Sequence, residues 1–114
     1  MSENCIFCDL IKNNTAHRVN AGVYRIVPLN PVTKGHVLFV SETHSRNASE
    51  IPIITGVVFQ VASAWAGASA EDYNLITSVG TNATQTVHHL HVHYVPRTEN
   101  DGLTLPWTGQ VKDE

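Results

Sequence analysis

Three histidines of the chain, His89, His91 and His93, alternate with Leu90 and Val92. Because successive side chains of a β-strand point to opposite faces, this spacing places three imidazoles on one face, about 6.6 Å apart along the strand. Neighbouring imidazoles repel one another when all are protonated, so we expect at least some of them to be neutral. Neutral imidazole is both a nucleophile and a metal ligand. The spacing therefore predicts a catalytic or metal-binding cluster.

The segment before the histidines contains groups that suit a phosphate. Residues 80–84 (GTNAT) form a loop of small residues that can turn backbone N–H groups inward, and Gln85 and Thr86 add side-chain donors. Histidine is a competent phosphorus nucleophile and leaves well when it is protonated. The loop contains no P-loop lysine, and no acidic pair indicates Mg²⁺. We therefore expect an anion site made of amides, hydroxyls and imidazoles, with no magnesium.

A second set of potential ligands begins with the pair Cys5-x-x-Cys8. Two cysteines this close in sequence cannot cross-link a fold, so metal ligation, redox chemistry and inert thiols remain open. Zn²⁺ takes four nitrogen or sulfur ligands in tetrahedral geometry. Because the chain has no second C-x-x-C, histidines would have to complete a zinc site.

The composition limits the class of protein. A chain of 114 residues, 42% hydrophobic and 15% charged, is typical of one globular domain. Its net charge of −3, with histidine counted as neutral, disfavours a module that binds nucleic acid. No basic segment followed by an apolar one opens the chain, so we expect a cytoplasmic location. The uncharged segment 51–70 is long enough to span a membrane, but Pro52 and several polar residues dilute it, so we expect a core helix.

The hydrophobic pattern predicts the elements that carry these residues. Apolar residues recur at helical spacing in the long uncharged segment, whereas the other apolar segments are short or alternate, as in strands. The predicted elements are a short helix at 5–13, strands at 22–28, 36–40, 72–79 and 87–95 (the last ended by Pro96), and a long helix at 51–68. We predict a single α+β domain over 1–114, with a less regular tail at about 99–114. Its antiparallel β-sheet has about five strands, with the long helix packed on one face.

Four motifs occur in an order that matches a known family. They are the H-x-H-x-H of 85–93 (QTVHHLHVH), followed by Pro96 and Arg97, and the segments 5–11 (CIFCDLI), 31–40 (PVTKGHVLFV) and 101–107 (DGLTLPW). With these motifs the chain resembles the histidine triad (HIT) superfamily of nucleotide hydrolases and transferases, in particular its Hint-type branch. The resemblance covers nearly the whole chain and implies a HIT-like fold.

The resemblance implies a role for each histidine of the catalytic face. His91 corresponds to the family's nucleophile, which attacks the α-phosphorus of a nucleotide derivative and forms a covalent nucleotidyl-histidine. Water then releases the nucleoside monophosphate. His93 corresponds to the histidine on the phosphate and leaving-group side, and His36 to one that supports the active-site face. The implied substrate is a purine nucleoside phosphoramidate or a related nucleotidyl conjugate.

The resemblance also implies a set of residues that contact the nucleotide. They are Gln85, Thr86, Thr84 and Trp107. Asn30 lies near the position where many members have a ribose-binding acidic residue, and we expect it to take that residue's place. For Trp107 two alternatives stay open, core packing or a lid over the base, because an indole suits stacking on a nucleobase. In family dimers the tail reaches the partner's site, so the resemblance further implies a homodimer.

A structural zinc ion is implied by the resemblance as well, on Cys5, Cys8, His44 and His89.

Three positions depart from the family's pattern. Pro28 stands where many members have an acidic residue that holds the ribose, and Ser78 and Thr84 replace a common Asn and Gly. These departures leave open a nucleotide-binding module without catalysis. The H-x-H spacing also suits metal ligands, so a hydrolase with a catalytic metal on His89, His91 and His93 is a further hypothesis.

Overall fold

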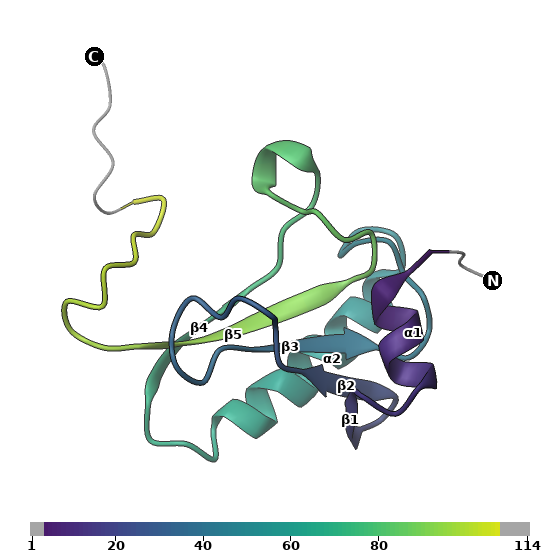
Figure 1. Ribbon diagram of the computed structural model, residues 1–114, viewed down its shortest axis with the longest axis horizontal. Helices are drawn as coiled ribbons and strands as arrows, with labels where there is room; N and C mark the ends of the chain where they lie inside the picture. The colour runs from purple at the N-terminus through teal and green to yellow at the C-terminus, as the bar shows by residue number, and fades with distance from the viewer. Residues whose placement is uncertain (1–3, 108–114) are drawn as a thin grey trace.

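The computed structural model describes residues 4–107. The elements follow in the order α1 (Ile6–Lys12), β1 (His17–Asn20), β2 (Val23–Ile26), β3 (Val37–Ser41), α2 (Pro52–Ala66), β4 (Asp72–Ile76), the 3-10 turn η1 (Thr81–Ala83) and β5 (His91–Arg97). Within the described residues the strands form one antiparallel sheet in the order β1-β2-β3-β5-β4 (Figure 1). The predicted α+β fold with five strands is confirmed.

Helix α2 covers one face of the sheet. Pro52 stands in its first turn, where the missing N–H breaks no hydrogen bond. The buried side chains of the helix join those of β3 and β5 in one core, which contains Val58, Val61, Ala62, Ala66, Phe39, Val92 and Tyr94. A second core lies between α1 and the opposite face and contains Phe7, Ile26, Leu38 and Val40. Between residues 4 and 107, no helix is long and apolar enough to cross a membrane.

The strand that carries the histidines begins later than predicted. β5 starts at His91, so the prediction of a strand over 87–95 is wrong for its first four residues. The backbone N–H of Leu90 donates to the carbonyl of the loop residue Ser45 (2.6 Å), so the chain leaves the ladder before His91. The apolar residues Leu90, Val92 and Tyr94 alternate with histidines on both sides of this point, so the sequence pattern does not show where β5 begins.

β5 also ends later than predicted, because Pro96 does not stop it and the strand continues to Arg97. The carbonyl of Pro96 accepts a hydrogen bond from the Thr33 hydroxyl (3.2 Å), so this residue faces the loop before β3. In a strand the N and O atoms of one residue face the same neighbour, and the ladder with β3 stops at the pair Val37–Tyr94. The missing N–H of Pro96 therefore interrupts no ladder hydrogen bond.

Two other strands differ from the prediction for local reasons. β1, the fifth strand, was not located from the sequence, because it pairs only with β2 and its side chains are mostly exposed. β4 ends at Ile76, before the predicted end at 79, because the Thr77 hydroxyl donates to the carbonyl of His91 (2.8 Å). Residues 99–107 form no helix or strand, and residues 108–114 of the expected tail lie outside the described residues.

Candidate active site and metal centre

His91 and His93 lie on the face of the sheet that α2 does not cover. Val92 and Tyr94 are buried against α2, and neighbouring residues of a strand alternate between faces. The two imidazoles are half-buried beside each other, with ring centroids 5.1 Å apart. The regular strand β5 therefore places two of the three motif histidines together.

The ring of His91 is fixed by the backbone before it. Its Nδ1 lies 2.7 Å from the carbonyl oxygen of His89, and a carbonyl can only accept, so Nδ1–H donates and the lone pair is on Nε2. Phe7 of α1 packs edge-on against the ring, with centroids 5.2 Å apart. Burial lowers the pKa of His91, which keeps the ring neutral near pH 7. His91 can thus present a neutral Nε2 as a nucleophile.

A chain of hydrogen bonds determines the tautomers of His36 and His93. The backbone N–H of Val32 donates to Nδ1 of His36 (3.1 Å), so the proton of neutral His36 is on Nε2. That Nε2–H donates to Nδ1 of His93 (3.0 Å), which leaves the proton of His93 on its own Nε2. Burial lowers the pKa of both residues, and nearby His91 and His36 help to lower that of His93 to about 4. His93 is therefore a neutral donor beside the lone pair of His91.

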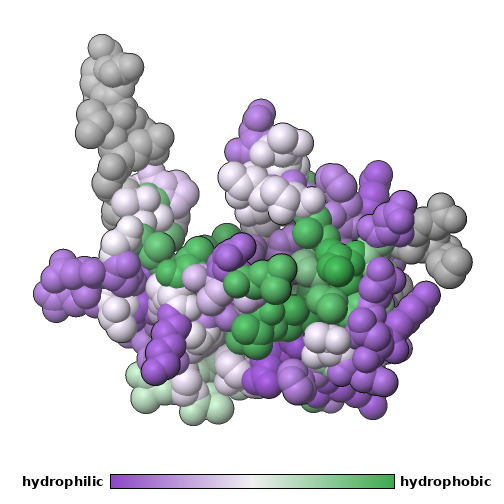
Figure 2. All heavy atoms as spheres, in the orientation of Figure 1, coloured by the Kyte–Doolittle hydropathy of each residue, from purple (hydrophilic) through white to green (hydrophobic). Residues whose placement is uncertain are grey.

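The loop before β5 is tied to the body by Gln85. Its buried side-chain carbonyl accepts from the N–H of Gly80 (3.0 Å), and its amide donates to the carbonyls of Arg46 (2.7 Å) and Val87 (3.1 Å). All of these partners are protein groups, so the amide shapes the loop. Thr84 has a φ of 69°, a left-handed conformation that glycine adopts more readily. In Figure 2 the loop with η1 stands out from the body of the molecule.

The other nucleotide-binding residues predicted from the sequence lie at the surface. Thr84, Thr86 and Asn30 are exposed, and Trp107 is 76% exposed, which excludes core packing for this indole within the described chain. Thr86 is one lining residue of a cavity of about 600 Å³, together with Asn4, Cys5, Ile6, His44, Arg46, Val87 and His88. No described hydrogen bond joins Asn30 or Trp107 to the histidines.

The four predicted metal ligands come together between α1 and the residues before β5. The ligand atoms of Cys5, Cys8, His44 and His89 all lie within 4.8 Å of one another. Nδ1 of His89 is 3.2 Å from Sγ of Cys5 and 3.5 Å from Sγ of Cys8, and Nδ1 of His44 is 3.4 Å from Sγ of Cys8. A tetrahedral zinc ion separates sulfur and nitrogen ligands by about 3.5 Å. The four residues are close enough to hold a metal ion.

The surroundings of these ligands also suit a cation. Nε2 of His89 lies 2.8 Å from the carbonyl oxygen of Ser41 and must donate to it, which leaves Nδ1 free as a ligand. Burial is the main cause that lowers the pKa of His89 to about 4, so the ring is neutral. Burial and the neighbouring Cys5 raise the pKa of the Cys8 thiol to about 11. Burial disfavours the charged thiolate, and two adjacent thiolates repel each other. A bound cation would supply the charge that the two thiolates require.

Several supporting groups could not be found from the sequence. Ser41, Val32 and Ser45 act through backbone atoms, which carry no sequence signal. Phe7 stands inside the C-x-x-C segment, where an aromatic residue suggests only core packing. Position in the fold gives these groups their roles beside the histidines.

The chain is similar in sequence to proteins of one known family. The HIT domain family matches residues 12–100 of the chain. An uncharacterized HIT-like protein of Methanocaldococcus jannaschii is 31% identical over 118 residues, which cover 96% of this chain and 90% of that protein. The adenosine 5'-monophosphoramidase of Saccharomyces cerevisiae is 31% identical over 116 residues, which cover 96% of this chain and 73% of that protein.

A solved structure gives the same result for the fold. The crystal structure of a HIT family protein from Bacillus anthracis matches with a TM-score of 0.76 at 31% identity, and the match covers 94% of this chain and 83% of that one. The predicted HIT-like fold is therefore confirmed. Since the family match spans more than half of the chain and relatives share 31% identity over nearly all of it, the chain belongs to the HIT domain family.

Proposed function

We propose that this protein hydrolyses or transfers the nucleotidyl group of a purine nucleoside phosphoramidate or a related conjugate, through a covalent intermediate on His91. The observation that carries the proposal is the fixed tautomer of His91, whose Nδ1–H donates to the His89 carbonyl while Nε2 keeps its lone pair. Histidine in this state attacks phosphorus and later leaves well. The name of the yeast relative, adenosine 5'-monophosphoramidase, supports the substrate class.

The reaction takes two steps that this arrangement can support. Nε2 of His91 attacks the α-phosphorus, the phosphorus–nitrogen bond of the substrate breaks, and the amine leaves with a proton taken from solvent. The carbonyl of His89 stabilises the charge that develops on the His91 ring through Nδ1–H. Water then attacks phosphorus, the bond to Nε2 breaks, and the nucleoside monophosphate is released.

His93 binds the phosphate in this proposal, and His36 orients His93. Because the proton of His93 is on Nε2, this atom donates a hydrogen bond to a phosphate oxygen, and the His36 donor holds the ring in that tautomer. Thr86 adds a donor from the loop, whereas the Thr84 hydroxyl donates to the carbonyl of Ala83, and Gln85 holds the loop in shape. Asn30 and Trp107 contact the nucleoside, and Trp107 does so in a homodimer through its exposed indole.

The metal in this proposal is zinc, held by Cys5, Cys8, His44 and His89. When bound, it would neutralise the thiolates and tie α1 to the residues before β5, as a structural ion with four protein ligands and no open position. A catalytic metal on the three motif histidines is not favoured, because Nδ1 of His89 faces the sulfur of Cys5 and its Nε2 faces the carbonyl of Ser41. No magnesium is required, and we expect the protein to act in the cytoplasm.

Intact-protein mass spectrometry after mixing with an adenosine 5'-phosphoramidate tests the proposal. We expect a transient gain of one adenylyl group, which His91→Asn abolishes while the circular dichroism spectrum is retained. The matched control is His88→Asn, because His88 is exposed and lies outside β5. An adduct that persists in His91→Asn, or wild-type turnover by that variant, would show that the nucleophile is wrong. Tight binding of AMP with neither adduct nor turnover would instead indicate the binding module.

A further inference from the structure

Phe7 is the buried residue of the short helix α1 and stands between two members of the candidate metal site. We call Cys5, Cys8, His44 and His89 the ligand cluster. Cys5 begins the helix, and its Sγ accepts from the backbone N–H of Cys8 (3.3 Å). A helix of seven residues has little stability of its own, so its contacts with the body decide where it lies. The position of Phe7 is therefore tied to that of the two cysteines.

The Phe7 ring contacts two histidines at once. Its centroid lies 5.9 Å from that of His89, at an angle of 77°, and 5.2 Å from that of His91, at 76°. Edge-to-face pairs of this kind are a favourable geometry for aromatic rings. Phe7 is only 7% exposed, so it presents little surface to a substrate. The ring is placed to hold the two imidazoles.

His89 connects the ligand cluster to His91 by a second route. Nδ1 of His89 lies 3.2 Å from Sγ of Cys5, while its backbone carbonyl accepts from Nδ1–H of His91 (2.7 Å). Because His89 is fully buried in a close-packed interior, it has little room to move. The two contacts that orient the His91 ring, the Phe7 edge and the His89 carbonyl, are thus both attached to the ligand cluster.

We infer that Phe7 is a positioning residue, which couples the ligand cluster to the candidate nucleophile His91. With α1 held at its cysteines, the Phe7 edge keeps the His91 ring turned so that Nδ1–H donates to the His89 carbonyl. Without this edge the ring can rotate about its Cβ–Cγ bond, which takes Nδ1 away from the carbonyl and removes the preference for one tautomer. The effect on catalysis rests on the proposed function, whereas the effect on the ring needs no substrate.

Nitrogen NMR spectra of the His91 ring in the zinc-loaded protein at about pH 7.5 test this inference. Phe7→Leu removes the ring edge but keeps an apolar side chain and all four ligands. In the wild type we expect one tautomer, with Nδ1 protonated. In Phe7→Leu the signals of the two ring nitrogens should shift in opposite directions, because the ring then samples both tautomers. Cys8→Ser, which weakens the cluster and keeps Phe7, should shift them in the same sense.

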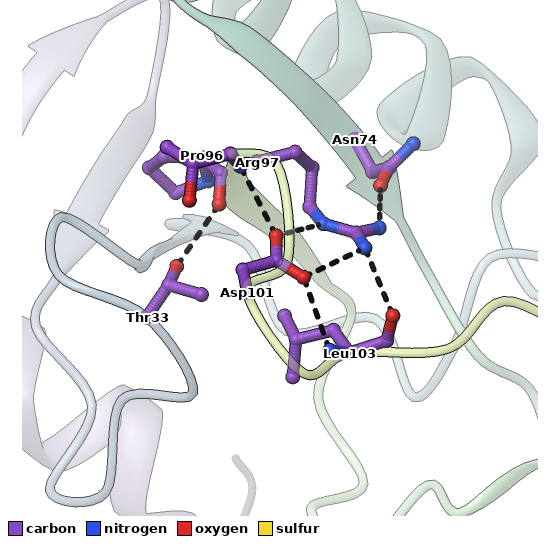
Figure 3. Close-up of polar contacts among 7 residues, drawn as sticks. Thr33, Asn74, Pro96, Arg97, Asp101 and Leu103 are labelled. Atoms are coloured by element: carbon purple, nitrogen blue, oxygen red, sulfur yellow. Dashed lines mark hydrogen bonds and ion pairs between the residues drawn. The ribbon is translucent and has the colours of Figure 1, made fainter.

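Two control variants separate the positioning of His91 from general stability. Phe59→Leu makes the same change at a half-buried position that packs against the other core. Asp101→Ala breaks an ion pair at the far end of β5, where Nε of Arg97 donates to the Asp101 carboxylate (2.8 Å) and the side chains are only 20% and 9% exposed (Figure 3). Both controls should keep the wild-type spectrum of His91, even where their melting temperatures fall.

The rate at which the adduct forms on His91 gives a second readout. After mixing with an adenosine 5'-phosphoramidate, we expect Phe7→Leu to form the adduct about tenfold more slowly than the wild type, with KM changed less than about twofold. Phe59→Leu should keep the wild-type rate. A misdirected nucleophile slows the chemical step, whereas a lost substrate contact would raise KM.

A wild-type His91 spectrum in Phe7→Leu or in Cys8→Ser would overturn the inference. The same holds if a control variant shows the shift as well, or if Phe7→Leu raises KM and leaves the rate of adduct formation unchanged. A wild-type protein that forms no adduct refutes the proposed function, while the spectra of the free protein still decide whether Phe7 orients the ring.

Discussion

Protonation of His93 should make the folded protein less stable in mild acid. Burial, with repulsion from His91 and His36, lowers the pKa of His93 from 6.5 to about 4. In the unfolded chain this histidine returns to its ordinary pKa, so between about pH 6.5 and about pH 4 the unfolded state binds a proton that the folded state does not. The free energy of unfolding therefore decreases as the pH falls through that window.

The size of the effect follows from the two pKa values. At about pH 5 the difference in proton binding lowers the free energy of unfolding by about 2 kcal/mol, since one pKa unit corresponds to about 1.4 kcal/mol. The ring is only partly buried, so screening by solvent reduces the effect, and we expect about 1 kcal/mol from His93. Neutral His91 and His36 add smaller effects of the same sign, because burial lowers their pKa values too.

Urea unfolding of the metal-loaded protein at about pH 7.5 and about pH 5 measures this difference. His93→Asn has no titrating ring and should lose about 1 kcal/mol less than the wild type between the two pH values. The control His17→Asn removes an exposed histidine and should follow the wild type. If His93→Asn lost as much stability in acid as the wild type, the neutral state of His93 in the folded protein would be refuted.

Three further changes should alter stability in ways that the structure explains. Thr84→Gly should raise the free energy of unfolding in urea by about 0.5 kcal/mol, since a left-handed φ costs an L-residue more than glycine loses in chain entropy. Chelation should lower the melting temperature by about 10 °C or more in scanning calorimetry, and Cys8→Ser should remove that response to the chelator. Val92→Ala should cost about 2 kcal/mol in urea unfolding, because Val92 is fully buried, whereas Val27→Ala, at an exposed position, should stay within about 0.5 kcal/mol.

The sequence predicted those parts of the fold that have a strong apolar pattern. Helix α2 and strand β3 follow from long or continuous apolar segments that must be buried, and both were found within about two residues. β1 is an edge strand with exposed side chains, so no burial pattern marks it. The continuation of β5 through Pro96 depends on which neighbour that residue faces, and this is decided by tertiary pairing.

The candidate sites were predicted as sets of residues, while their internal geometry was not. Residue types and the resemblance brought Cys5, Cys8, His44 and His89 together as one ligand set, and the structure places their ligand atoms close together. The tautomers were not predictable, because they depend on the backbone N–H of Val32 and on backbone carbonyls. Gln85 was predicted from its place in the motif to contact nucleotide, and its buried bonds show that it holds the loop.

The irregular step before β5 explains how one short motif serves two sites. In a regular strand the carbonyl of His89 would point sideways to a neighbouring strand, whereas the His91 side chain would project out of the sheet, so the two could not meet. Because the chain leaves the ladder at Leu90, that carbonyl is free to accept from Nδ1 of His91. The His89 ring, which lies before this step, contacts the two cysteines through Nδ1. Spacing of the histidines alone therefore could not decide which nitrogen of His91 is free, since the backbone of His89 decides it.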